Sequence, residues 1–175
     1  MEPESAASIR PRVIAAEPRH LPGVAAIYAE LVVSSPATFD LQVPPADHWE
    51  RMLARVDPQA GHFLIVAIDD AETVLGVAKS GRFRERAAYD TTCETSIYVD
   101  GAAQGKGVGR ALYRRLIELL EASPLRLAVG GVTEPNPASA ALHESLGFTR
   151  VGTFEGVGFK FGQPWSVTWY QRPLT

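Results

Sequence analysis

The chain has 175 residues, of which 17 are Lys or Arg and 20 are Asp or Glu, so its formal net charge at pH 7 is -3. With 46% hydrophobic and 21% charged residues, it has the composition of an ordinary globular protein. Its length is close to that of one domain with a sizeable core, which argues against a two-domain clamp. Its cations are few and scattered, so we expect no nucleic-acid partner.

Cysteine and histidine usage limits the chemistry further. Cys93 is the only cysteine, which excludes an internal disulfide framework, and the four isolated histidines do not show the spacing of a zinc site. We therefore expect a reducing compartment, the cytoplasm, and no metal. The first twenty residues contain no apolar signal segment, and no stretch approaches the roughly 18 apolar residues of a membrane span. Neither secretion nor membrane insertion is expected.

The first third of the chain predicts a flexible start followed by a strand and two helices. Residues 1–9 are small and polar and are expected to be a flexible N-terminus, whereas residues 10–175 are expected to form a single domain. A short strand is expected at residues 12–15. Apolar residues then recur at helical spacing as far as Ser34. The Pro44–Pro45 pair opens a second short helix that ends near Arg55.

The central part of the chain predicts a β-meander. Two apolar runs at residues 62–68 and 73–80 are separated by the turn-forming sequence Asp-Asp-Ala-Glu, which indicates a hairpin. A basic, aromatic loop at residues 82–89 leads into residues 92–99, whose β-branched content favours a strand.

The last part predicts alternating helices and strands. An amphipathic helix begins at Val108, and a second helix begins at Asn136–Pro137 and ends at Gly147. Strands are expected at residues 125–132, 148–154 and 165–171, with a glycine-rich loop at 156–162. The element order predicts an α/β (α+β) fold, with a mixed, mostly antiparallel sheet of six to seven strands and helices on both faces.

A glycine-rich turn, Gln104-Gly105-Lys106-Gly107-Val108-Gly109-Arg110, joins a predicted strand to the amphipathic helix. Glycine lets backbone N–H groups approach a ligand closely, and a helix N-terminus has unpaired donors and a positive dipole end. A pyrophosphate fits such a turn. The spacing is neither that of a P-loop nor that of a dinucleotide fingerprint, and a plain strand-to-helix turn is the alternative.

Several spaced motifs together carry a family resemblance. The turn resembles the Q/R-x-x-G-x-G/A pyrophosphate loop of the GNAT superfamily of acyl-CoA-dependent N-acetyltransferases. The segment at residues 136–148, NPASAALHESLGF, resembles the second signature of that superfamily. The segments at residues 84–99 and 158–162 are similar to its phosphinothricin and methionine sulfoximine acetyltransferase branch. The resemblance covers roughly residues 10–173.

The resemblance implies a GNAT fold, an acyltransferase that uses acetyl-CoA as cosubstrate without a metal, and a homodimer. It also implies that the backbone of Val99 polarises the thioester carbonyl, as an oxyanion donor would. The residues that it implies for acetyl-CoA binding are Ile97, Tyr98, Val99, Gln104, Gly105, Lys106, Gly107, Val108, Gly109, Arg110, Asn136 and Ser139.

Glu94 is the candidate catalytic base. An ammonium group has no lone pair, so a base must take its proton before the nitrogen attacks a thioester. Along an extended strand, Glu94, Ser96 and Tyr98 share one face, and Cys93 faces the other way as a small core residue. A solvated strand face is the alternative interpretation of Glu94, and the resemblance to the branch favours the catalytic one.

His143 is the second catalytic candidate. It stands where many GNAT enzymes carry a tyrosine, and the histidine matches the phosphinothricin branch instead. An imidazole can donate or accept a proton near neutral pH, so an acid role, help in amine activation and a structural role all stay open. Asn136 is also an ideal helix N-cap, and this role is compatible with contact to the pantetheine arm.

Arg84, Arg86 and Tyr89 form the expected acceptor pocket, because two arginine forks beside an aromatic ring favour an anionic, amino-acid-like acceptor. A solvated basic hairpin is the alternative. The complete set of expected acceptor-binding residues is Phe39, Arg84, Arg86, Tyr89, Glu94, Thr95, Ser96 and Phe159.

The predicted reaction is therefore direct transfer of acetyl to the primary amine of an acceptor such as phosphinothricin, methionine sulfoximine or methionine sulfone. Two alternatives stay open. One is a GNAT enzyme for another amine, such as an antibiotic, a polyamine or a protein N-terminus. The other is a non-catalytic acyl-CoA-binding sensor, in which Glu94 is incidental.

Overall fold

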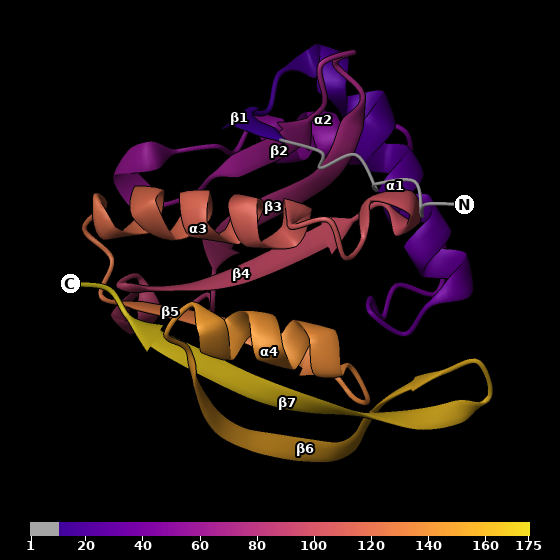
Figure 1. Ribbon diagram of the computed structural model, residues 1–175. Helices are drawn as coiled ribbons and strands as arrows, with labels where there is room; N and C mark the ends of the chain where they lie inside the picture. Colours follow the sequence, from indigo (N-terminus) through magenta and orange to yellow (C-terminus); the bar gives the residue numbers. More distant parts are fainter. Residues whose placement is uncertain (1–10) are drawn as a thin grey trace, which may run out of the picture.

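A computed structural model describes residues 11–175, so the expected flexible N-terminus at residues 1–9 lies outside the described residues. The fold is built on one seven-stranded sheet with the strand order β1-β2-β3-β4-β5-β7-β6 (Figure 1). The strands are β1 (Arg12–Ala15), β2 (Leu64–Ile68), β3 (Val74–Arg82), β4 (Thr92–Val99), β5 (Leu127–Thr133), β6 (Thr149–Lys160) and β7 (Gln163–Pro173). All pairings are antiparallel except β4 with β5.

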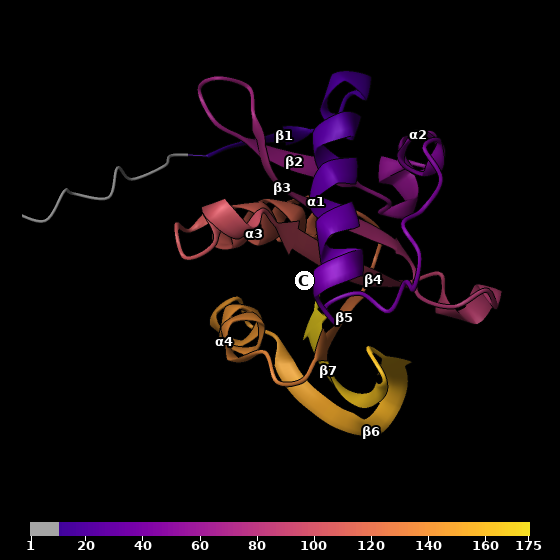
Figure 2. The ribbon, with the colours of Figure 1, turned by 90° about the vertical axis from the view of Figure 1, so that its right-hand side faces the viewer.

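Four α-helices cover the two faces of the sheet. They are α1 (Leu21–Ser34), α2 (His48–Leu53), α3 (Val108–Glu121) and α4 (Pro137–Ser145). Short 3-10 helices occur at Pro18–His20, Pro58–Ala60, Ala87–Tyr89 and Gly101–Ala103. Figures 1 and 2 show α3 and α4 on one face, and α1 and α2 on the other. The predicted mixed, mostly antiparallel α/β fold is confirmed.

Each face of the sheet has its own hydrophobic core. The amphipathic helix α3 buries one stripe, which includes Leu112, Leu116 and Leu120, against the inner strands. On the opposite face, α1 and Trp49 of α2 pack on β2 and β3. Cys93 is buried in the α3 core, as its place on the strand predicts. Among residues 11–175, the helices are all too short or too polar to cross a membrane.

Two expected elements differ from the structure. The second helix begins only at His48, because Pro44–Pro45 lies in the loop before it. The glycine-rich segment at residues 156–162 is not a loop, and most of it continues β6. A register shift between Phe154 and Gly158 accommodates its glycines. The true turn is the pair Phe161–Gly162, with φ of 53° and 74°, the left-handed geometry of a two-residue hairpin turn.

β4 and β5 form the only parallel pair in the described sheet, and it is between these two strands that the sheet opens. β4 and β5 pair at three positions, from Thr92 with Leu127 to Glu94 with Val129, although both strands continue beyond them. In Figure 1, β4 and β5 diverge from this short ladder. On the side toward β5, the backbone of Ile97 to Val99 therefore faces a gap, whereas its other edge pairs with β3.

Candidate active site

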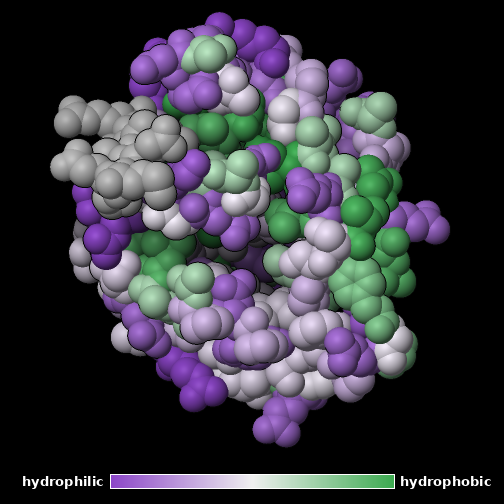
Figure 3. Space-filling view, turned by 45° about the vertical axis from the view of Figure 1, so that its right-hand side comes forward, coloured by the Kyte–Doolittle hydropathy of each residue, from purple (hydrophilic) through white to green (hydrophobic). Residues whose placement is uncertain are grey.

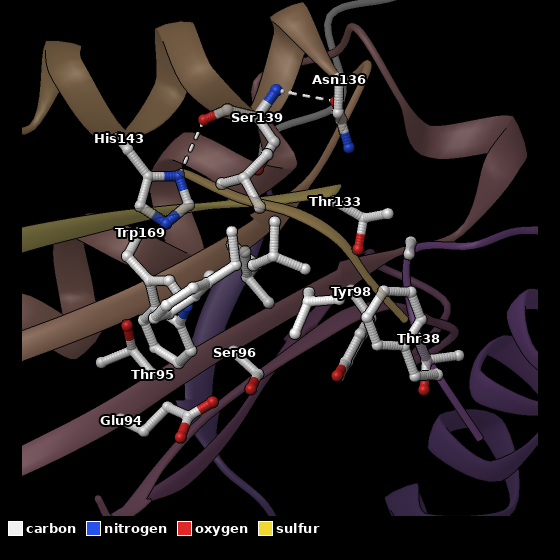
Figure 4. A pocket seen from close by; sticks show the side chains of 18 of the residues that line it. Thr38, Glu94, Thr95, Ser96, Tyr98, Thr133, Asn136, Ser139, His143 and Trp169 are labelled. Atoms are coloured by element: carbon white, nitrogen blue, oxygen red, sulfur yellow. Dashed lines mark hydrogen bonds between the residues drawn. The ribbon is translucent and has the colours of Figure 1, made fainter. Parts of the chain in front are cut away.

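A cavity of about 460 Å³ lies where β4 and β5 separate. β4 supplies Glu94, Ser96, Ile97 and Tyr98, β5 supplies its far wall, and α4 supplies His143. Figure 3 shows the surface hollowed on this side of the molecule. In Figure 4, Glu94 and His143 point into the same cavity from different walls. The structure thus brings the two predicted catalytic side chains together, although they are far apart in the chain.

Glu94 forms the last rung of the β4–β5 ladder, opposite Val129, and its side chain is half-buried. Burial raises the pKa of this carboxyl, and the positive charges of Lys79 and Arg84 partly oppose the rise. Neither cation forms an ion pair with Glu94 in the described part of the chain. A carboxylate with a raised pKa and an unshared lone pair can accept a proton from a bound amine.

His143 has a defined tautomer. Its Nδ1 lies 2.8 Å from the carbonyl oxygen of Ser139, and a carbonyl can only accept, so Nδ1 carries the proton. In the neutral ring, Nε2 then has the free lone pair. Burial lowers the pKa of His143, whose side chain is only 4% exposed, and the ring is neutral at pH 7. The tautomer therefore leaves the lone pair of Nε2 available as an acceptor, while burial makes the ring a weaker base than a free imidazole.

A cluster of buried polar groups lies where β4 and β5 separate. The hydroxyl of Thr95 donates to the carbonyl oxygen of Val129 at 3.0 Å and lies 2.7 Å from the hydroxyl of Tyr113. It thereby satisfies a carbonyl at the end of the short ladder. Gly130 allows this arrangement, because a Cβ there would lie 2.8 Å from Nε2 of His143 and 3.2 Å from the Tyr113 hydroxyl. Thr95 borders the cavity, but its hydroxyl is engaged in this buried cluster.

The glycine-rich turn has the geometry of an anion site. Gly105 and Gly107 have φ of 72° and 82°, a left-handed conformation that glycine adopts without strain. Gly107 is the N-cap of α3 and no side chain caps this helix, so its first N–H groups are available to a ligand. Gly109 has neither constraint, because a Cβ there would make only an ordinary contact with Leu142 of α4, at 3.5 Å. The turn adjoins the end of β4, beside the gap between the strands.

The start of α4, which the sequence also predicts to contact acetyl-CoA, contains a helix cap. Asn136 is the N-cap of α4, and its side-chain oxygen accepts from the backbone N–H of Ser139 at 3.0 Å (Figure 4). Both residues also line the cavity. The expected N-cap is confirmed, and the position of both residues leaves them free to contact a bound ligand as well.

The acceptor residues predicted from sequence separate into two groups. Phe39, Arg84 and Ser96 line the cavity together with Glu94. Arg86, Tyr89 and Phe159 are exposed and lie outside its lining. Arg84 is held beside the ring of Phe83, with its guanidinium carbon 4.3 Å from the ring centre. One arginine, rather than two, therefore borders the cavity.

Sequence reasoning missed several lining residues. They are Tyr113 from α3, Thr133 from β5, Phe154 from β6, and Val167 and Trp169 from β7. Each fits an apolar or β-branched pattern that ordinary core packing also produces, so no local signal distinguishes them. The length of the β6–β7 hairpin, which brings Val157 to the cavity, was hidden by its glycines.

Comparison with known proteins agrees with this geometry. A family model described as "Acetyltransferase (GNAT) family" matches residues 25–148, most of the chain. The chain belongs to the GNAT acetyltransferase family. It is thus an acyltransferase by family, and the resemblance seen in the sequence is confirmed.

Relatives of this family member bear more specific names. The chain is 41% identical over 150 residues to a phosphinothricin N-acetyltransferase of Streptomyces coelicolor, covering 85% of this chain and 87% of that protein. It is 37% identical over 156 residues to an L-methionine sulfoximine/L-methionine sulfone acetyltransferase of Pseudomonas paraeruginosa, covering 88% and 89%. A phosphinothricin acetyltransferase from Sinorhizobium meliloti, solved in complex with acetyl-CoA, superposes with a TM-score of 0.88 at 32% identity, covering 94% of this chain and 88% of that one.

Proposed function

We propose that this GNAT protein transfers the acetyl group of acetyl-CoA to the primary amine of a small amino-acid-like acceptor of the phosphinothricin, methionine sulfoximine or methionine sulfone type. The observation that carries the proposal is the convergence of Glu94 and His143 on one cavity at the gap between β4 and β5. The names of the relatives support the acceptor class.

The glycine-rich turn binds the pyrophosphate of acetyl-CoA in this proposal. Lys106 and Arg110 add positive charge beside the uncapped N-terminus of α3. The pantetheine arm then runs along the free edge of β4, past Ile97 and Tyr98, and α4 borders it through Asn136. The backbone N–H of Val99 stabilises negative charge on the thioester oxygen during attack.

Proton transfer assigns separate roles to the two titratable groups. An ammonium loses two protons when it becomes an amide nitrogen. Glu94 takes the first, which frees the lone pair that attacks the thioester carbonyl. Nε2 of His143 takes the second after the new C–N bond forms, and the C–S bond breaks to release the CoA thiolate. The neutral, Nδ1-protonated ring of His143 supports a role as acceptor rather than donor.

The acceptor lies with its amine toward Glu94 and its anionic group toward Arg84. The guanidinium fork of Arg84 suits a carboxylate or phosphinate. The cavity lining also includes the apolar side chains of Phe39, Val157 and Trp169, which suit the short side chain of such an acceptor.

A panel assay of thiol release tests this function. The purified protein and acetyl-CoA are incubated with methionine sulfoximine, methionine sulfone, phosphinothricin, a polyamine and an N-terminal peptide. We expect turnover on the three amino-acid acceptors. Turnover confined to the polyamine or the peptide would show that the proposed acceptor class is wrong. Tight acetyl-CoA binding without any turnover would favour a non-catalytic sensor.

We also propose that the protein is a homodimer that works in the cytoplasm. Exposed apolar side chains along the β6–β7 hairpin support association, namely Val151, Phe154, Val157, Phe159 and Phe161. Figure 3 shows apolar side chains gathered along one edge of the molecule. The single buried thiol of Cys93 suits a reducing compartment.

A further inference from the structure

Lys160, at the end of β6, is a buried lysine that contacts a distant part of the chain. Its side chain is only 3% exposed. Its Nζ donates to the carbonyl oxygen of Ser35 at 2.9 Å and to that of Thr38 at 2.7 Å. Both acceptors belong to the loop between α1 and α2, more than 120 residues earlier in the chain. One ammonium therefore joins the β6–β7 hairpin to this loop.

A second contact between the same segments lies beside the first. The ring of Phe39 packs on Gly158 so closely that a Cβ at Gly158 would lie 2.3 Å from it. The hairpin holds Lys160 in place, because Nε1 of Trp165 donates to its carbonyl oxygen at 2.9 Å and the ring of Phe161 lies 5.0 Å from its Nζ. Two contacts thus hold the loop against the hairpin. The ammonium of Lys160 binds its carbonyl groups, and the ring of Phe39 packs on the backbone of Gly158.

The opposite side of the loop is anchored to α1. The hydroxyl of Tyr28 donates to Asp40 at 2.7 Å and lies 2.6 Å from the hydroxyl of Thr38. Asp40 in turn donates its backbone N–H to Thr38 at 3.3 Å. Residues 35–40 are therefore fixed between a tyrosine on one side and a lysine on the other.

This loop is part of the cavity wall. Thr38 and Phe39 line the cavity at the end away from His143, and Figure 4 shows Thr38 beside Tyr98. A buried ammonium is costly unless oxygen atoms satisfy its donors, so Lys160 favours the arrangement in which the two carbonyl groups face it. An apolar residue of the same length would fill the space without favouring that arrangement.

We propose that Lys160 is a positioning residue for the acceptor: it locks residues 35–40 against the β6–β7 hairpin and so forms the acceptor end of the cavity from two distant segments. The inference rests on the proposed function. It concerns acceptor binding, because Thr38 and Phe39 of the locked loop line the cavity and the hydrogen bonds of Lys160 reach no residue of the glycine-rich turn.

The test compares Lys160→Met with the parent enzyme and with Arg150→Met, which removes a cation from an exposed position on the same strand. If the lock holds the loop closed and its loss leaves a tenth to a fifth of molecules competent, the acceptor KM rises about five- to tenfold. The KM for acetyl-CoA should stay unchanged, and Lys160→Arg should recover part of the loss. An acceptor KM within about twofold of both the parent and Arg150→Met would overturn the proposal.

Hydrogen–deuterium exchange provides a readout that does not need turnover. Backbone amides of residues 35–40 should exchange faster in Lys160→Met than in Arg150→Met, with the rest of the sheet unchanged. Equal exchange in the two variants would refute the lock. If the parent enzyme acetylates no acceptor, the proposed function fails while the exchange experiment still decides whether the lock exists.

A variant on the other anchor covers the case in which Lys160→Met does not fold. Tyr28→Phe removes the hydroxyl that reaches Asp40 and Thr38 and keeps the ring that packs on Trp49 and Tyr98. We expect the same direction of change, a higher acceptor KM with an unchanged acetyl-CoA KM. The proposal would be contradicted if Tyr28→Phe had the parent's acceptor KM and if the amides of residues 35–40 exchanged at the parent's rate.

Discussion

Glu94 combines a half-buried carboxyl with two cations that approach it without forming an ion pair. Burial raises its pKa, and Lys79 and Arg84 limit the rise. The opposite balance holds for Lys79, whose pKa is lowered by burial and raised by Glu94. The site therefore holds a weakly solvated carboxyl whose raised pKa makes it a stronger base than a free glutamate, which suits proton removal from an ammonium.

Glu94→Gln is expected to lower kcat by about 100-fold or more, because it removes the proton acceptor at nearly unchanged volume. The pKa of Glu94 is raised in the fold above 4.5, so the stability that the protonated form contributes is lost as the pH rises through the raised value. The variant should therefore melt at a higher temperature than the parent at pH 7, and this difference should shrink below about pH 4.5.

Kinetics and thermal melts of Glu94→Gln and of Glu155→Gln measure both effects. Glu155 is exposed on β6 and outside the cavity lining, and its variant should match the parent in both assays. A Glu94→Gln enzyme with the parent's kcat would remove Glu94 from the mechanism, whatever its melting temperature.

Strand alternation was sufficient to predict the direction of Glu94, because side chains on a strand alternate strictly between faces. The tautomer of His143 was beyond sequence reasoning, since it depends on the carbonyl of Ser139 one turn earlier on α4. Gly130 carried no signal either, because its role arises from the approach of two side chains on different helices.

At the scale of elements, the N-terminus of α3 and the end of β4 form one continuous binding edge. The turn between them needs left-handed backbone at Gly105 and Gly107, which glycine alone adopts at low cost. Gly107 has open space at its Cβ position, so the constraint there is the backbone conformation and not crowding.

Gly107→Ala is expected to raise the KM for acetyl-CoA about tenfold, because a left-handed alanine costs roughly 1–2 kcal/mol and relaxes the turn away from its binding geometry. The acceptor KM should not change. Gly101→Ala is the matched control, since Gly101 also has open space but lacks a left-handed φ. Steady-state kinetics with each substrate varied in turn decide the matter; a lower melting temperature with unchanged KM would indicate a plain structural turn.

Element boundaries were predictable where local signals are strong. The strand at residues 92–99 and the N-cap at Asn136 follow directly from β-branched content and capping chemistry. The full length of the β6–β7 hairpin was not predictable, because the glycines at residues 156–162 are typical of a loop. In the structure, a register shift between Phe154 and Gly158 accommodates them within β6.

At the scale of the whole molecule, two sets of contacts connect the segments that surround the cavity. The three-position β4–β5 ladder joins the strands at one end of the gap. The contacts of Lys160 join the β6–β7 hairpin to the α1–α2 loop. The β6–β7 hairpin that supplies Lys160 also presents a row of exposed apolar side chains. Residues of this kind are rarely gathered on a monomer without a partner.

Sedimentation analysis is expected to give twice the mass of one chain. A double variant, Val151→Lys with Phe159→Lys, places charges in the apolar row and should yield a monomer, because burying two unpaired charges in an interface is costly. Val33→Lys changes an equally exposed apolar residue on α1 and should leave the dimer intact. A monomeric parent, or a dimer lost equally in Val33→Lys, would refute this interface.

The position of β7 in the sheet has a consequence for folding. It follows β6 in the chain, yet it lies between β5 and β6 and pairs with both. Without β7, β5 would have only its short ladder to β4, and β6 would have no partner strand in the described sheet. The pairing of β7 therefore both attaches β6 to the sheet and places Val167 and Trp169 in the cavity wall.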